Sequence, residues 1–106
     1  MTRVTWYYAI IGERRAGQAV EEKVLSLHRI FDKAVLVRHE IGRIFSGWRL
    51  VIRGRGFTDE EISTIVRQWG EEDGVAGVTR AHVDRLPEPW HAEYLAGVAS
   101  GRRKVG

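Results

Sequence analysis

The chain has 106 residues, with 17 basic and 14 acidic side chains and a formal net charge of +3. It contains no cysteine and no asparagine, which excludes disulfides, thiol nucleophiles, cysteine-based metal sites and N-glycosylation sequons. A chain of this length suits one hydrophobic core.

Arginine outnumbers lysine by 14 to 3. One explanation is the codon usage of a GC-rich genome. The other is selection of arginine for planar, bidentate contacts with phosphate or carboxylate. The sequence leaves both explanations open.

The first predicted element is a strand over residues 4–11, VTWYYAII. Aromatic and β-branched residues favour a strand, and bulky side chains on both faces favour a central one. We expect one face, with Val4, Trp6, Tyr8 and Ile10, to point to the core and Tyr7 to lie on the open face of the sheet. The apolar run is too short for a membrane span and lacks the cleavage pattern of a signal peptide. We therefore expect a soluble cytoplasmic protein that does not bind membranes, with a loop over residues 12–17.

Apolar residues then recur at helical spacing, which predicts a helix over residues 18–32. They are Val20, Val24, Leu27 and Phe31.

Two alternating runs meet at Ser46-Gly47. A two-residue turn that ends in glycine predicts a β-hairpin over residues 35–57. Its apolar face would hold Val35, Val37, Ile41, Phe45, Trp48, Leu50 and Ile52. Its other face would hold Arg38, Glu40, Ile44, Arg49, Val51, Arg53 and Arg55.

A capping box follows the hairpin, with Thr58 at the N-cap and Glu61 three residues later. It predicts a helix over residues 59–70, ended by Gly70 or Gly74. The apolar stripe of this helix is Ile62, Ile65, Val66 and Trp69.

The last part of the chain is less regular. Residues 75–86 carry several charges and a glycine, which suits a strand at a sheet edge. Pro89 can begin a short helix over about residues 90–99, and residues 100–106 read as a mobile basic tail.

Taken together, the elements predict an α+β fold of the ferredoxin-like βαββαβ type. We expect a four-stranded antiparallel sheet with two helices on one face, formed by residues 1–86. Residues 87–106 would form a C-terminal appendix. No family-specific motif accompanies this order of elements, and the architecture hosts many unrelated functions.

We expect a small non-enzymatic interaction or regulatory domain, such as an accessory protein of a bacterium or its phage. It would bind a protein partner or itself, as a homodimer, through the open sheet face and the C-terminal segment. The expected contact residues are Tyr7, Arg38, Arg49, Val51, Arg53, Arg55, Trp90 and Tyr94. No residue pattern indicates a catalytic, metal or cofactor site, and we expect no cofactor.

Two alternatives remain. Arginine and tyrosine on a sheet resemble the surface on which RNA-recognition domains stack bases. Arg55-Gly56-Phe57 matches three positions of that family's longer motif, but Thr58-Asp59-Glu60 follows where apolar residues should continue. The second alternative is a small dimeric α/β-barrel-type enzyme that would use His39, His82 or His91 as a proton carrier.

Overall fold

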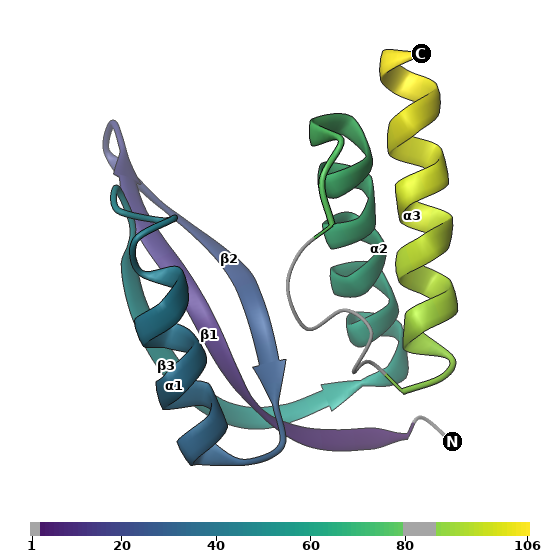
Figure 1. Ribbon diagram of the computed structural model, residues 1–106. Coiled ribbons are helices and arrows are strands. Elements are labelled where there is room, and N and C mark those ends of the chain that lie inside the picture. The colour runs from purple at the N-terminus through teal and green to yellow at the C-terminus, as the bar shows by residue number, and fades with distance from the viewer. Residues whose placement is uncertain (1–2, 80–86) are drawn as a thin grey trace. The chain divides into compact units, whose positions relative to one another are not determined.

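The computed structural model describes residues 3–79 and 87–106, and they form a mixed α+β structure with a three-stranded antiparallel sheet (Figure 1). In chain order, the elements are β1 (Val4–Ala16), β2 (Ala19–His28), α1 (Phe31–Ile41), β3 (Arg49–Thr58), α2 (Asp59–Ala76) and α3 (Trp90–Val105). The chain divides into two compact units. We call residues 3–57 the sheet unit and residues 58–106 the helix unit.

The first two strands form a hairpin that the sequence did not predict. β1 extends through the predicted loop to Ala16, and β2 pairs with it from Ala19 to His28. Gly17 lies in the connecting turn with φ +66°, a conformation that glycine adopts without steric cost. The predicted helix over residues 18–32 is therefore wrong. The strand order β2-β1-β3 places β1 in the centre, as predicted.

The first arm of the predicted hairpin is also wrong. Residues 31–41 form α1, and residues 42–47 form turns. Ala34 and Val37 are buried, and these two positions are three apart, as on one face of a helix. The chain does turn near Ser46-Gly47, because the Trp48 N–H donates to the Phe45 carbonyl at 2.9 Å. That turn joins α1 to β3, which is the strand that the sequence predicted.

The core of the sheet unit lies between α1 and one face of the sheet. It contains the buried residues Ile10, Leu25, Ala34 and Val37, with Tyr8, Ile41, Phe45, Leu50 and Ile52 packed against them. The predicted inward face of β3, with Leu50 and Ile52, is confirmed. At about 1.5 Å per helical residue and about 3.3 Å per strand residue, α1 spans less than half the length of β1.

The helix unit begins with the capping box. The Glu61 N–H donates to the Thr58 hydroxyl at 3.1 Å, and the Thr58 N–H donates to the Glu61 carboxylate at 3.0 Å. α2 was predicted here, but it continues past Gly70 and Gly74 and ends at Gly77, whose φ is +72°. Neither glycine in the helix is a terminator.

α2 and α3 run parallel to each other and touch through glycines (Figure 1). Gly70 and Gly74 of α2 face the backbone of α3, and Gly97 and Gly101 of α3 face the backbone of α2. A Cβ atom at any of the four would overlap a carbonyl oxygen of the other helix. α3 continues to Val105, so the tail predicted to be mobile is helical.

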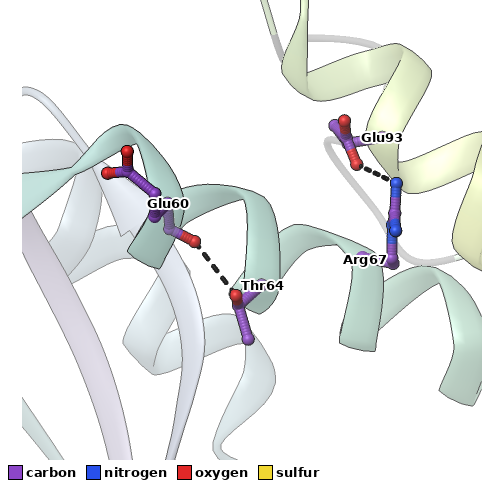
Figure 2. Close-up of polar contacts among 4 residues, drawn as sticks. All are labelled: Glu60, Thr64, Arg67 and Glu93. Atoms are coloured by element: carbon purple, nitrogen blue, oxygen red, sulfur yellow. Dashed lines mark hydrogen bonds and ion pairs between the residues drawn. The ribbon is translucent and has the colours of Figure 1, made fainter. Parts of the chain in front are cut away.

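Polar contacts join the same two helices. Arg67 donates to Glu93 at 2.7 Å (Figure 2), and Lys104 pairs with Glu71. These ion pairs are partly exposed, which limits each to ~0.2–1 kcal/mol.

The predicted fourth strand is not confirmed. Its first residues, Val75 and Ala76, end α2, residues 77–79 are not in a strand, and residues 80–86 lie outside the described residues. The four-stranded ferredoxin-like sheet is therefore not confirmed either. No helix in the described part of the chain has the length and apolar character to cross a membrane.

Candidate functional site

The two units differ in charge. Residues 3–57 carry 11 basic and 5 acidic side chains, a net charge of +6, whereas the rest of the chain carries 6 basic and 9 acidic side chains, a net charge of −3. The modest total of +3 hides this difference. A binding site for an anion is therefore expected in the sheet unit.

Some of this positive charge is neutralised within the sheet unit. Glu13 and Glu22 face each other across β1 and β2, and such like-charge pairs are destabilising. Arg53 of β3 lies 3.5 Å from Glu13 and 3.6 Å from Glu22, so it offsets their repulsion. Arg14 pairs with Glu21 at 2.8 Å. These arginines stabilise the sheet.

Several other cations of the sheet unit have no carboxylate partner among the described residues. Six exposed side chains make neither an ion pair nor a contact with an aromatic ring within the described ranges 3–79 and 87–106: Arg3, Arg15, Lys33, Arg38, Arg43 and Arg49. Their charges are available to an external anion.

Cations also lie over aromatic rings. The Arg55 guanidinium lies 3.8 Å from the centre of the Phe57 ring, and Arg29 lies 5.5 Å from that of Tyr7. The Tyr7 and Phe57 rings meet edge to face at 6.2 Å. Phe57 is buried, so this group is a packed cluster and offers its rings little access to a ligand.

The structure places five of the eight contact residues expected from the sequence on the neighbouring strands β1 and β3. Tyr7 lies on β1, and Arg49, Val51, Arg53 and Arg55 alternate with the inward residues of β3. Arg38 lies on α1 and not on the sheet.

The two aromatic residues expected to complete that surface lie in the helix unit. Trp90 begins α3 and is half-buried. Tyr94 is only 1% exposed, and its hydroxyl donates to the buried carboxylate of Asp73 at 2.6 Å. Tyr94 is therefore part of the packing between α2 and α3 and cannot serve as an exposed contact.

Sequence reasoning missed a partly exposed group of rings at the start of α1, which we call the aromatic row: Trp6, Tyr8 and Phe31. Trp6 meets Tyr8 edge to face at 6.4 Å, and Tyr8 meets Phe31 in the same way at 5.5 Å. Trp6 is 53% exposed and Phe31 is 51% exposed. The alternation of β1 assigned Trp6 to the core, but the short α1 leaves it uncovered.

Candidate groups for catalysis are few among the described residues. Ser26 and His28 share a hydrogen bond of 2.5 Å on β2. A hydroxyl beside an imidazole is only one part of a nucleophilic site, which also needs donors for an oxyanion. His39 is exposed on α1 and His91 lies 3.8 Å from Glu88, while His82 lies outside the described residues.

The described residues contain no group of three or more His, Cys, Asp or Glu side chains placed to hold a metal ion. The chain matches no protein-family model, and no curated protein or solved structure is significantly similar to it. Its function must therefore be argued from its surface.

Proposed function

We propose that the chain binds nucleic acid through the sheet unit. The observation that carries the proposal is the set of six exposed cations on a unit of net charge +6. Phosphate groups bind such cations and release condensed counterions, and this release supplies much of the free energy of nucleic-acid binding.

The exposed rings favour nucleic acid over an acidic protein surface. Nucleic acids present both phosphates and the flat faces of bases, and proteins that bind them combine cations with aromatic side chains. Trp6 and Phe31 are half exposed on the unit that carries the excess positive charge. Exposed cations and exposed rings on the same unit suit a ligand that carries both negative charge and flat aromatic groups.

The test is fluorescence anisotropy with labelled oligonucleotides of mixed sequence at low and at physiological ionic strength. The double variant Arg38→Glu/Arg43→Glu should weaken binding by about tenfold or more, because contacts with phosphate become repulsive. The matched control is Arg102→Glu/Arg103→Glu, an equal change of charge at exposed positions of α3. It should leave the affinity close to that of the wild type.

Two outcomes would overturn the proposal. One is the absence of binding to single-stranded and duplex oligonucleotides at low salt. The other is an equal loss in the two double variants, which would show that binding depends on total charge and not on the sheet unit.

A second candidate function is contact with a protein, either a partner or a second copy of the chain. It is favoured by apolar side chains exposed on and around α1, since groups of such residues often mark interfaces. They are Ile30, Leu36 and Ile44, which are 58%, 61% and 76% exposed. If copies associate there, light scattering should show a dimer that Leu36→Glu/Ile44→Glu converts to a monomer.

A further inference from the structure

We infer that the nucleic acid bound by the sheet unit is single-stranded, and that Trp6 and Phe31 stack on its bases. The inference rests on the function proposed above and names the ligand class and the residues that would recognise it.

The aromatic row is held in place before any ligand binds. Tyr8 packs against the core of the sheet unit and meets Trp6 and Phe31 edge to face, with interplanar angles of 85° and 71°. Such contacts favour defined ring orientations. The two outer rings are therefore oriented by Tyr8 while about half of each remains accessible.

Two glycines of β3 make room for this surface. A Cβ atom at Gly54 would lie 2.8 Å from Cζ2 of Trp6, and one at Gly56 would lie 2.7 Å from Cγ1 of Val4. The residues of β1 therefore lie directly against the bare backbone of β3. Trp6 packs over the backbone of β3 at Gly54, and 53% of it stays exposed to a ligand.

Exposed cations are close in sequence to the rings on both chain segments that carry the row. Arg3 directly precedes Val4 at the start of β1. Arg38 follows Phe31 by seven residues on α1, with Val35 between them, and this spacing puts all three on one flank of the helix. A strand whose bases stack on the rings could thus place phosphates near Arg3 and Arg38.

The exposed rings distinguish single strands from duplexes. Bases in a duplex are stacked on each other and paired, so their faces are inaccessible to a side chain. Unpaired bases can stack on aromatic rings, and this stacking tolerates any sequence. The phosphate contacts alone would not discriminate, because both forms carry phosphates.

The experiment compares full-length protein with Trp6→Leu and Phe31→Leu, using a labelled oligothymidylate and a duplex of the same length. Leucine keeps an apolar side chain but has no π-face. Each variant should weaken single-strand binding by about 5- to 100-fold and leave duplex binding unchanged. Trp6→Phe, which keeps a ring, should retain most of the affinity.

The matched control is Leu36→Ala. Leu36 is also an exposed apolar residue of the sheet unit, but it lies on a different flank of α1 from Phe31, because the two are five residues apart. Circular dichroism of every variant checks that the fold is retained. The control should bind both oligonucleotides like the wild type.

The inference fails separately from the proposed function. If the leucine variants bind the single strand like the wild type while Arg38→Glu/Arg43→Glu binds weakly, stacking is wrong and nucleic-acid binding stands. Duplex binding as tight as single-strand binding also overturns the inference. If the wild-type protein binds neither oligonucleotide at low salt, both proposals fail, and the apolar surface is left to a protein partner.

Discussion

The hydroxyl groups of Thr58, at the N-cap of α2, and of Thr64, inside α2, make different hydrogen bonds. Thr58 accepts a hydrogen bond from a backbone N–H that has no partner within the helix. Thr64 instead donates its hydroxyl to the Glu60 carbonyl at 3.0 Å (Figure 2), and this carbonyl can also accept from the helix backbone. The threonine side chain therefore stabilises α2 at position 58 and adds little to its stability at position 64.

We predict opposite results for the same substitution at these two sites. Thr58→Ala should lower the free energy of unfolding by ~1 kcal/mol, because it removes the capping bond. Thr64→Ala should leave the free energy of unfolding unchanged or raise it by at most ~0.7 kcal/mol, because alanine has a higher helix propensity than threonine. Urea unfolding of both variants measures the difference. Equal effects would mean that the capping box does not stabilise α2.

The residues of the candidate site were only partly predictable. The alternation of β3 correctly grouped Arg49, Val51, Arg53 and Arg55, because a period of two assigns a strand's side chains to faces whatever the strand pairs with. Exposure could not be predicted in this way. Trp6 is on the face that the pattern assigned to the core, and it is exposed because of the length of α1, which the local sequence of β1 does not encode.

At the scale of elements, the errors arise from weakly patterned segments. β2 is largely exposed along its first half, so its few apolar residues fit a helical period as well as a strand period. Its structure is set by pairing with β1, which is not a local property. α1 contains the run Ala34-Val35-Leu36-Val37, and a short apolar run of this kind does not distinguish helix from strand.

The length of α2 and α3 and the close contact between them were not predicted, for a related reason. Gly70 and Gly74 are four residues apart, as are Gly97 and Gly101. Taken singly, each glycine lowers helix propensity and suggests a weak or ending helix. Taken together, two pairs with this spacing allow two backbones to approach closely, as small residues do between membrane helices. The signal was present in the sequence as a relation between two segments.

We predict that replacing an interface glycine of α2 or α3 with alanine destabilises the protein, although the same change usually stabilises a helix. In an exposed helix such a change stabilises by ~1 kcal/mol. At Gly70 or Gly101 the added methyl group would overlap the facing carbonyl oxygen, so each variant should be destabilised by ~1–3 kcal/mol. The control is Gly47→Ala, where nothing lies within 4 Å of the added atom. Thermal unfolding gives the order, and a stabilised Gly101→Ala would contradict this packing.

At the scale of the whole molecule, the distribution of charge says more than its sum. A net charge of +3 on 106 residues indicates little by itself. Its division into a unit of +6 and a remainder of −3 gives one part of the chain most of the attraction for an anion. Within that unit, ion pairs further separate arginines that stabilise the sheet from those that are available to a ligand.

This separation predicts different salt dependences for two arginine variants. Each phosphate contact contributes about 0.7–0.9 to the slope of log affinity against log salt concentration. Arg38 has no ion-pair partner among the described residues. Arg38→Gln should therefore reduce the magnitude of the slope by nearly the contribution of one phosphate contact. Arg53 already pairs with Glu13 and Glu22, so Arg53→Gln should leave the slope almost unchanged.

The measurement is a salt titration of oligonucleotide binding for the wild type and both variants. Arg53→Gln can still weaken binding at a single salt concentration, because it leaves two carboxylates without their cation. The slope distinguishes this indirect effect from a lost phosphate contact, since only the contact releases counterions. A larger decrease of the slope for Arg53→Gln than for Arg38→Gln would move the binding surface from the flank of α1 to the face of the sheet that carries Arg53.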